Sequence, residues 1–318
     1  MSELPGAKIV AFGGYQPDKV VTNDDLAKIM DTSDEWITTR VGIKSRRVAR
    51  DDETVTDMAE AAGAKALAAS GLEPSEIDLV IVATCSTESP IPNVAASAAA
   101  RLGIVAPGAY DLNAACAGFC YALGTASDAV RTGSARNVLV IGAEKMTNWI
   151  DWTDRSTCII FADGAGAAVV SPTAPGEPTG IGPTVWGSVG DQAYRITIPG
   201  KTGWLTQDGQ AVFRWTTTAI APVALEACRR AGLTPADISM FVSHQANLRI
   251  IEAIAKKLGI PRDRVADDII NAGNTSSASV PLALSRLAEQ GRLQPGKPVL
   301  LVAFGAGLSY ASQVITVP

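Results

Sequence analysis

The chain contains two similar halves, and this internal repeat limits the folds that it can adopt. Residues 71–77 (GLEPSEI) resemble residues 232–238 (GLTPADI), and the second copy follows the first by 161 positions. The apolar run at 138–141 (VLVI) resembles the run at 299–302 (VLLV), again 161 positions later. Segments that recur in the same order at the same offset indicate a duplicated domain.

A third pair agrees with this interpretation and helps to place the boundary between the halves. Leu-Gly-Ile occurs at 102–104 and again at 258–260, an offset of 156 residues. Residues 171–187 between the copies are rich in Pro, Gly and Thr, which is typical of a connection. We therefore predict an N-terminal half at 1–172 and a C-terminal half at 173–318.

Strand and helix patterns alternate within each half. Short apolar runs predict buried strands of a parallel-rich sheet at 79–83, 138–141 and 300–304. Helical patterns lie between them, several with Ser or Asp caps and terminal glycines, at 55–70, 94–102, 118–132, 217–231, 248–258 and 281–290. The alternation predicts an α/β architecture in which helices separate the sheets.

Composition excludes several classes of protein. The 318 residues are enough for two cores, and 47% hydrophobic residues indicate a globular chain. A net charge of −5 and a pI near 5.1 argue against general nucleic-acid binding. No apolar run approaches the roughly 20 residues that span a bilayer, and the N-terminus lacks the pattern of a signal peptide. We expect a cytoplasmic protein that binds neither nucleic acid nor membrane.

The cysteines and the histidine restrict the chemistry further. The five cysteines are odd in number and form no CxxC pair, so neither a zinc site nor a disulfide framework is expected. His244 is the only histidine, which excludes a metal site built from several histidines. Any imidazole chemistry must therefore use His244.

Cys116 is the candidate nucleophile. It lies in the segment 111–119 (DLNAACAGF), which reads as a strand end that turns into a helix. Unsatisfied N–H groups and the positive dipole end at a helix N-terminus favour the thiolate, so we predict a lowered pKa for this thiol. Such a thiol suits thioester exchange. A buried structural cysteine fits the local sequence equally well.

Two further polar residues follow predicted strands in the second half. His244 comes directly after the apolar run at 240–242, at the strand end where ligands gather in α/β sheets. Asn274, in the segment 271–277 (NAGNTSS), lies 158 positions after Cys116. We interpret it as the symmetry counterpart of Cys116, so both turns would meet at one central site. Taken alone, His244 could be structural and Asn274 an ordinary helix cap.

Two glycine-containing turns complete the candidate site. The segment 304–307 (FGAG) follows the last apolar strand, and its free N–H groups could form an oxyanion hole. The segment 161–166 (FADGAG) is better explained by packing and turn geometry. Neither has the strand–helix context or the downstream acid of a dinucleotide fingerprint.

With these residues in place, the chain resembles β-ketoacyl-[acyl-carrier-protein] synthase III, a condensing enzyme of the thiolase superfamily, over nearly its whole length. Nine ordered motifs carry the resemblance, at 33–37 (SDEWI), 39–43 (TRVGI), 113–119 (NAACAGF), 154–155 (DR), 161–166 (FADGAG), 209–213 (GQAVF), 244–247 (HQAN), 273–276 (GNTS) and 304–307 (FGAG). The single histidine separates the chain from elongating synthases, which would have a second histidine. The chain also differs from thiolases, which would have a second catalytic cysteine.

The resemblance implies a thiolase-like α/β fold with duplicated halves packed as α-β-α-β-α layers. It also implies a decarboxylative Claisen condensation of an acyl-CoA starter with malonyl-acyl carrier protein (malonyl-ACP) in type II fatty-acid biosynthesis. The products would be β-ketoacyl-ACP, CoA and carbon dioxide, formed through an acyl-Cys116 intermediate. No cofactor is expected, because the CoA thioester is a substrate, and the protein is expected to be a homodimer.

The resemblance assigns roles residue by residue. His244 and Asn274 would donate hydrogen bonds to the malonyl thioester oxygen, while the N–H groups of Cys116 and Ala306 would hold the oxyanion beside Phe304. The CoA site would consist of Trp36, Arg40, Arg155, Gly209, Phe213, Ala246 and Asn247, with the adenine between Trp36 and Arg155. The acidic carrier protein would meet Arg214, Arg249, Lys256 and Lys257. Positions 249, 256 and 257 share one helix face, which by spacing alone would suit a solvated surface equally well.

The chain departs from the family pattern at four places. Ile91 stands where acetyl-preferring members often have a Phe in the acyl pocket, so longer or branched starters are expected. Val41 replaces a Thr that some members of the family have. Ala306 replaces a Gly, and this change should not matter because only the N–H of the residue would contact the oxyanion. Residues 191–205 have no clear counterpart in the family.

Three alternatives stay open at this point. A polyketide priming synthase would use the same chemistry in another pathway. An acyltransferase that does not condense often lacks the Asn, so Asn274 argues against it. A non-enzymatic partner subunit would lack the cysteine, so Cys116 argues against that class.

Overall fold

Two mixed β-sheets form the framework of the computed structural model, which describes residues 5–200 and 203–318. The first sheet has the order β1-β7-β6-β4-β5. Its strands are β1 (Ala7–Tyr15), β4 (Leu79–Ala83), β5 (Gly108–Leu112), β6 (Val138–Lys145) and β7 (Asp163–Pro172). The second has the order β11-β12-β13-β8, with β8 (Val185–Gly187), β11 (Met240–Ser243), β12 (Pro298–Phe304) and β13 (Tyr310–Thr316).

The second sheet repeats the topology of four of the five strands of the first sheet, β4, β6, β7 and β1, as the repeat in the sequence predicts. In the first, β4 is parallel to β6, and β7 is antiparallel to both β6 and β1. In the second, β11 is parallel to β12, and β13 is antiparallel to both β12 and β8. The registers also correspond, because Leu79 pairs with Val138 and Met240 pairs with Val299. Each residue of the second pair lies 161 positions after its counterpart.

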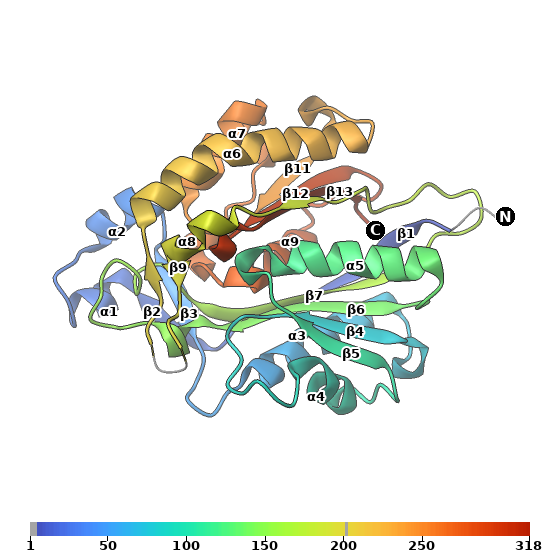
Figure 1. Ribbon diagram of the computed structural model, residues 1–318, viewed down its shortest axis with the longest axis horizontal. Helices are drawn as coiled ribbons and strands as arrows, with labels where there is room; N and C mark the ends of the chain where they lie inside the picture. Colours follow the sequence, from blue (N-terminus) through green and yellow to red (C-terminus); the bar gives the residue numbers. More distant parts are fainter. Residues whose placement is uncertain (1–4, 201–202) are drawn as a thin grey trace.

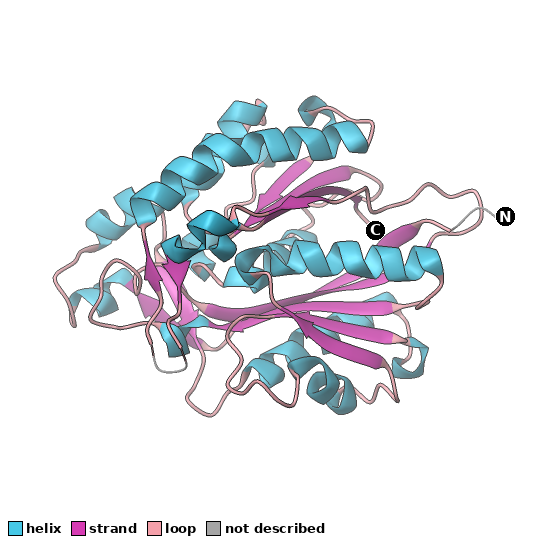
Figure 2. Ribbon diagram, in the orientation of Figure 1, coloured by secondary structure: helices cyan, strands magenta, loops and turns pink. Residues whose placement is uncertain are grey.

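Helices cover the outer faces of both sheets and fill the space between them (Figures 1 and 2). The first sheet is covered by α3 (Val55–Ser70) and α4 (Val94–Arg101), and the second by α6 (Gly209–Arg230) and α7 (Leu248–Leu258). The central layer consists of α5 (Gly118–Thr132) and α9 (Ser279–Glu289). The predicted α-β-α-β-α layering is confirmed.

The sequence of α5 explains why it can lie between two sheets. Phe119 and Leu123 are fully buried, and each contributes roughly 1.5–3 kcal/mol by leaving water. Ala117, Ala122 and Ala126 are buried as well, and their small side chains let the helix approach both sheets. The helix therefore belongs to the core that the two halves share.

Glycines in the first sheet bring the central layer close to the strands. A Cβ on Gly166 would lie 2.3 Å from the backbone N of Leu282 and 2.5 Å from the carbonyl carbon of Pro281. A Cβ on Gly142 would lie 2.6 Å from the Ser277 carbonyl oxygen. Only glycine fits at these contacts, so segment 161–166 serves packing, as predicted.

The remaining elements lie mostly at the ends of the layers. They include β2 (Lys19–Thr22), β3 (Ser45–Val48), β9 (Ile196–Thr197), β10 (Thr206–Gln207), α1 (Asn23–Ala27), α2 (Asp34–Val41) and α8 (Ile269–Ala272). The 3₁₀ turns are η1 (Pro74–Glu76), η2 (Ala115–Ala117), η3 (Met146–Trp149), η4 (Gly190–Arg195), η5 (Pro235–Asp237), η6 (Arg262–Arg264), η7 (Ser276–Ala278) and η8 (Ala306–Leu308).

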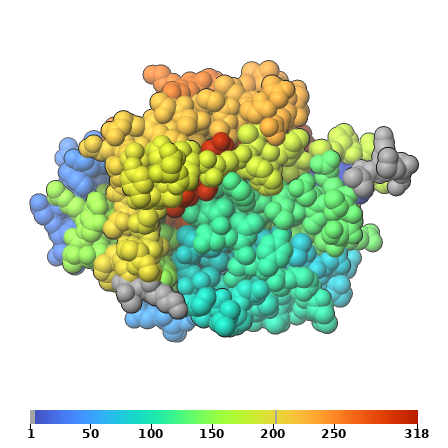
Figure 3. Space-filling view, in the orientation of Figure 1, coloured from blue at the N-terminus to red at the C-terminus, as the bar shows by residue number. Residues whose placement is uncertain are grey.

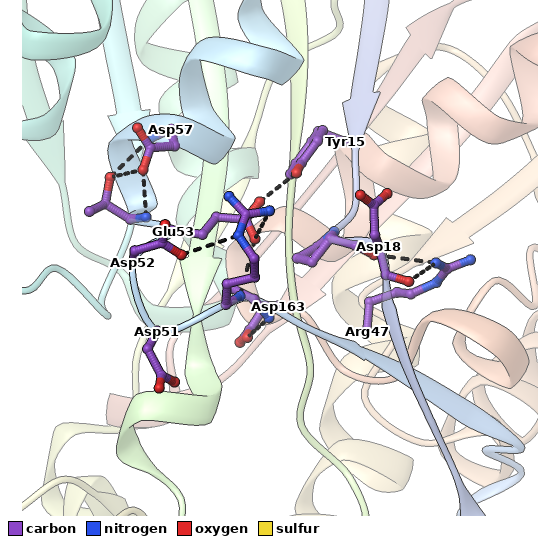
Figure 4. A network of polar contacts seen from close by, with 12 residues as sticks. Tyr15, Asp18, Arg47, Asp51, Asp52, Glu53, Asp57 and Asp163 are labelled. Carbon is purple, nitrogen blue, oxygen red and sulfur yellow. Dashed lines mark hydrogen bonds and ion pairs between the residues drawn. The ribbon is translucent and has the colours of Figure 1, made fainter.

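Polar contacts attach the segment before α3 to the first sheet (Figure 4). The hydroxyl of Tyr15 donates to Glu53, and Arg47 donates to the carbonyl oxygens of Pro17 and Asp18. The buried carboxylate of Asp163 accepts from the N–H of Ala49 at 2.8 Å. This segment is thus held at several points along its length.

The predicted helices match the structure except at some ends. The helices at 55–70, 118–132 and 248–258 are confirmed at both ends. The helix predicted to begin at 217 begins at Gly209, because Asp208 caps it by accepting from the N–H of Ala211. The last predicted helix begins at Ser279, with Pro281 in its first turn, where proline costs no hydrogen bond.

Within residues 5–200 and 203–318, no helix combines the length and the apolar character needed to cross a bilayer.

We predict that Gly166→Ala destabilises the protein by about 3 kcal/mol, because its methyl group would overlap the backbone of α9. Chemical denaturation monitored by circular dichroism measures this change. Gly190→Ala is the matched control, because a Cβ there meets nothing within 4 Å. Equal stability of both variants would contradict the tight contact between β7 and α9.

Candidate active site

A cavity of about 440 Å³ lies where the two halves meet, and residues of both halves line it. The sequence-predicted residues that line it are Cys116, Gly209, Phe213, His244, Ala246, Asn247, Asn274, Phe304 and Ala306. Eight other predicted residues lie outside its lining and are described below.

Cys116 lies in η2, between the end of β5 and the start of α5. The preceding Ala115 has a φ of +47°, and its N–H donates to the Asn113 side chain at 3.1 Å. Gly305 lies directly against the nucleophile: a Cβ there would be 2.7 Å from the Cys116 Cβ and 3.1 Å from its Sγ. Only glycine at position 305 leaves the thiol its space.

The prediction that Cys116 has a lowered pKa is wrong. Burial raises the pKa of the Cys116 thiol to about 11, and the negative charge of Glu144 acts in the same direction. The Ser276 hydroxyl, 3.4 Å from Sγ, opposes this rise. Loss of hydration therefore outweighs the stabilisation expected from the helix N-terminus, and the thiol is neutral near pH 7.

His244 follows β11, as predicted, and is almost completely buried. Its ring meets Phe304 edge-on, with the ring centroids 5.3 Å apart. Burial lowers the pKa of His244 to about 3, so the imidazole is neutral at physiological pH. A neutral imidazole can donate through one nitrogen only.

Ser279 determines which nitrogen of His244 carries the proton. The Ser279 hydroxyl accepts from the N–H of Gln245 at 3.2 Å and lies 2.7 Å from His244 Nδ1. Among the described residues this hydroxyl has no other acceptor for its proton, so we assign it as the donor to Nδ1 and place the ring proton on Nε2. The Nε2–H group is thereby left as a donor.

The orientation of Asn274 is fixed by its own backbone. Its Oδ1 accepts from the N–H of Ser276 at 2.9 Å, and only the oxygen of a carboxamide can accept from an N–H. Its main chain bonds to Ile160 and Ala162 on both sides. The Nδ2 group is thus left as a donor at the cavity wall, which Asn274 lines.

The structure corrects the symmetry relation between Cys116 and Asn274. Ala115 and Ser276 have matching positive φ values of 47° and 51°, and η2 and η7 are 161 positions apart. Asn274 therefore corresponds to Asn113, and each accepts from the N–H two residues later. The counterpart of Cys116 is Ser277. The offset of 158 came from matching the letters NAAC to NAGN, whereas backbone conformation sets the true register.

The turn that contains Ala306 lies against the backbone of Cys116. A Cβ on Gly305 would be 2.8 Å from the Cys116 nitrogen, so the turn that contains Ala306 reaches the N–H of Cys116. In the described part of the chain, neither Cys116 N–H nor Ala306 N–H donates to a backbone oxygen outside its own helical turn. This arrangement suits the stabilisation of an oxyanion.

Trp36, Arg40 and Arg155 gather outside the cavity. The Arg40 guanidinium lies 4.3 Å and that of Arg155 4.9 Å from the centroid of the Trp36 ring. Arg155 also donates to the Asp31 carbonyl at 2.8 Å. No ring fits between Trp36 and Arg155 at this separation, so an adenine would have to displace the guanidinium.

The four basic residues assigned to the carrier protein are exposed on α6 and α7. The Arg249 guanidinium lies 5.4 Å from the ring centroid of Phe213, which lines the cavity. Asn247 caps α7 through the N–H of Arg249 and donates to the Arg40 carbonyl at 3.2 Å. The basic surface therefore begins at the cavity wall.

Ile91 is 80% exposed and does not line the cavity of its own chain.

Several cavity residues were missed from the sequence. Ser276 and Cys85 line the cavity beside Cys116, although neither has a sequence signature of its own. Residues 196–198 of the segment with no family counterpart line the cavity, and Gln207, which pairs with Ile196 between β9 and β10, lines it as well. Figure 3 shows η4, which precedes this pair, in yellow-green at the front, beside red atoms of the C-terminal segment.

Two sequence families match the chain. The one described as 3-oxoacyl-[acyl-carrier-protein (ACP)] synthase III matches residues 110–190, and its C-terminal counterpart matches residues 228–317. A relative from Streptomyces coelicolor, β-ketoacyl-[acyl-carrier-protein] synthase III 4, is 54% identical. The match covers 98% of this chain and 99% of the relative's length.

Solved structures give the same result. The priming β-ketosynthase of the R1128 polyketide pathway has a TM-score of 0.96 and 44% identity, covering 100% of this chain and 98% of its own. The 3-oxoacyl-[acyl-carrier-protein] synthase III of Aquifex aeolicus has a TM-score of 0.94 and 41% identity, covering 98% of this chain and 100% of its own. The predicted thiolase-like fold is confirmed.

We predict that the His244 ring does not titrate between pH 5 and pH 8, because burial holds its pKa far below the usual range. Nitrogen NMR of protein labelled in histidine tests this directly, since the chain has one histidine. The expected spectrum is that of a neutral ring protonated at Nε2 across the range. A midpoint near pH 6.5 would contradict both the burial and the assigned tautomer.

Proposed function

Because the chain belongs to the 3-oxoacyl-[acyl-carrier-protein] synthase III family, we propose that it condenses an acyl-CoA starter with malonyl-ACP in type II fatty-acid synthesis. The chain is an acyltransferase-type condensing enzyme that initiates acyl chains. Its products would be β-ketoacyl-ACP, CoA and carbon dioxide. No bound cofactor is needed, because the CoA thioester is itself a substrate.

The first half-reaction is acyl transfer to Cys116. Its sulfur attacks the thioester carbon, and the carbonyl oxygen becomes an oxyanion. The N–H groups of Cys116 and Ala306 are proposed to hold that oxygen, since Gly305 brings both beside the thiol. One donor of this kind contributes roughly 3–4 kcal/mol to the transition state.

The second half-reaction is the decarboxylation of the malonyl group. As carbon dioxide leaves, enolate charge develops on the thioester oxygen. His244 Nε2 and Asn274 Nδ2 are proposed to donate to it, and the carbanion then attacks acyl-Cys116. The observation that carries this proposal is the pair of fixed donors, because Ser279 occupies Nδ1 of the ring and Ser276 N–H occupies Oδ1 of the amide.

The substrates are proposed to enter past the ends of α6 and α7. Gly209, Phe213, Ala246 and Asn247 line the cavity there and would contact the pantetheine arm. Trp36 and Arg155 would hold the adenine once Arg155 moves aside, with Arg40 near the phosphates. The exposed Arg214, Arg249, Lys256 and Lys257 would attract the acidic carrier protein.

The starter group is proposed to be longer or more branched than acetyl. In the family the pocket wall comes from the partner of a homodimer, and the 80% exposure of Ile91 in one chain is compatible with that arrangement. A smaller side chain than Phe leaves more room for the acyl group. The homodimer itself is part of this proposal.

One observation favours a second candidate function. The R1128 priming β-ketosynthase shares 44% identity and nearly the whole fold with this chain. A priming synthase of a polyketide pathway would use the same residues, so pathway and starter require experiment. Simple acyl transfer without condensation is disfavoured by the orientation of Asn274.

We predict that the purified enzyme, given malonyl-ACP and a series of acyl-CoAs, forms β-ketoacyl-ACP, with a preference for branched or longer starters. Mass spectrometry of the carrier protein reads the products. Cys116→Ala is expected to abolish the acyl-enzyme. His244→Ala and Asn274→Ala should each slow decarboxylation by about 10²–10³-fold while the acyl-enzyme still forms.

The absence of β-ketoacyl-ACP with every starter would reject condensation in favour of acyl transfer. Acyl-enzyme formation by the Cys116→Ala variant would show that Cys116 is not the nucleophile.

We predict that Lys256→Glu combined with Lys257→Glu raises KM for malonyl-ACP about tenfold, equivalent to about 1.4 kcal/mol. Acylation by acyl-CoA should not change, because neither lysine lines the cavity. Lys297→Glu is the matched control, being an exposed lysine just before β12, at the opposite end of that strand from Phe304. The same rise in KM for the control would show a general charge effect.

A further inference from the structure

The Ser276 hydroxyl contacts the sulfur of the nucleophile and has no role in the chemistry described so far. It donates to Cys116 Sγ at 3.4 Å, and among the described residues no other side chain donates to this sulfur. In the proposed mechanism His244 and Asn274 donate to the malonyl thioester oxygen, and the N–H groups of Cys116 and Ala306 hold the acyl oxyanion. All of these donors serve oxygens, so negative charge on the sulfur has none.

Such charge forms on the Cys116 sulfur before acylation. The thiol loses its proton to water, the sulfur electron pair bonds to the thioester carbon, and the carbonyl π electrons move onto the oxygen. The carbonyl then re-forms as CoA leaves with the electron pair of its C–S bond and takes a proton from water.

The charge forms a second time when the product is released. After the carbanion has attacked acyl-Cys116, the tetrahedral oxyanion re-forms a carbonyl and the C–S bond breaks. Its electron pair stays on the sulfur, which later takes a proton from water. Burial makes the charged sulfur costly in both steps, because it removes the hydration that a thiolate has in water.

Ser276 has two acceptors for its one proton. Its Oγ also lies 2.9 Å from Oε1 of Glu144, a fully buried carboxylate near the end of β6. A hydroxyl hydrogen rotates to suit its partners, so it can turn from one acceptor to the other. The carboxylate is the stronger acceptor beside a neutral thiol, whereas a thiolate competes with it for the hydrogen bond.

The Glu144 carboxylate does not depend on Ser276. Both of its oxygens accept from backbone N–H groups, at 3.1 Å from Cys85 and at 3.3 Å from Ser277. Its further donors include the hydroxyls of Thr84, Ser86 and Ser277. The carboxylate therefore remains hydrogen-bonded when the Ser276 proton turns to the sulfur.

The turn η7 holds the Ser276 hydroxyl in place. Ser276 is fully buried, and its N–H donates to Asn274 Oδ1 at 2.9 Å. A donor that is already positioned needs little rearrangement when charge forms beside it, and this makes fixed donors effective in catalysis.

We propose that Ser276 is a catalytic residue, whose hydroxyl donates a hydrogen bond to the Cys116 sulfur while that sulfur carries negative charge. The hydrogen bond stabilises both the attacking thiolate and the thiolate released from the condensation product. Ser276 transfers no proton, so neither Ser276 nor Glu144 changes its protonation state. The inference rests on the proposed function, because it concerns the acylation and release of Cys116.

Two neighbouring side chains are less suited to this task. The Cys85 thiol donates to Glu144 at 3.3 Å, so its proton is already used. His244 has its Nδ1 occupied by Ser279, and no hydrogen bond joins its ring to the sulfur in the described part of the chain. Ser276 is left as the side-chain donor for the sulfur.

The test compares two variants that each remove one hydroxyl from Glu144 Oε1. Ser276→Gly also removes the donor of the sulfur, and glycine suits the φ of +51° and keeps the N–H that bonds to Asn274. Ser277→Ala is the matched control, because its hydroxyl lies 2.7 Å from the same carboxylate oxygen, and among the described residues it has no hydrogen bond to the sulfur. Ser276→Ala, which also lacks the hydroxyl, repeats the test with a different backbone preference.

Two rates report on the sulfur. Alkylation of the Cys116 peptide by iodoacetamide at pH 8, followed by mass spectrometry, requires no substrate. Acyl-enzyme formation is measured with acetyl-CoA and isobutyryl-CoA. We expect both rates to fall about tenfold in Ser276→Gly and Ser276→Ala, because a hydrogen bond to a charged acceptor contributes at least that factor. Ser277→Ala should stay within about twofold of wild type, since only the carboxylate loses a donor.

Carbon dioxide release from malonyl-ACP without any acyl-CoA reports on the rest of the turn. Asn274 lies two residues before Ser276, so a general disturbance of η7 would slow this release. No charge forms on the sulfur in this reaction, so Ser276→Gly should keep the wild-type rate within about threefold.

Three results would overturn the proposal: wild-type alkylation rates in the Ser276 variants, an equal loss in Ser277→Ala, or carbon dioxide release slowed as much as alkylation. An equal loss in Ser277→Ala would show that the hydroxyl acts through Glu144. Slow alkylation confined to the Ser276 variants, with no acyl-enzyme in the wild type, would support the role of Ser276 and reject the proposed acyl-CoA substrate.

Discussion

The contact between the turns η2 and η7 governs the geometry of the site. An Asn lies two residues before each turn, and its side-chain oxygen accepts from the N–H of the first residue of the turn, which has a positive φ although it is not glycine. Buried strain of this kind persists only where the surroundings hold it. Here the surroundings are the central helices, the glycines of the first sheet, and Glu144, whose carboxylate binds groups from both halves. The turns beside Cys116 and Asn274 are therefore held in place by contacts with both halves of the fold.

The same enclosure sets the charge states of the site. Burial holds the imidazole of His244 and the thiol of Cys116 neutral, because it lowers the pKa of the imidazole and raises the pKa of the thiol. A neutral imidazole is the form that donates to a developing enolate without adding charge of its own. The cost falls on the thiol, because its neutral form must lose a proton when the sulfur attacks a thioester.

The proposed entrance for the substrates is built from short elements and surface side chains. The β9–β10 pair contributes only two residues from each strand, yet lines the cavity. The guanidinium groups of Arg40 and Arg155 lie over the Trp36 ring. In the proposed complex the adenine ring would take the place of the Arg155 guanidinium.

The sequence by itself determined the duplicated α/β architecture, because apolar periodicity and glycine caps act locally. Helices such as Val55–Ser70 end where the sequence places their caps. It also identified Cys116, His244 and Asn274, whose motifs lie at turns. Only the tertiary structure decided how they act. Asn274 matches Asn113, and the contact of Ser276 with Glu144 joins residues 132 positions apart. The thiol pKa also reversed direction from the sequence-based expectation, because desolvation depends on every group packed around the sulfur and not on its neighbours along the chain.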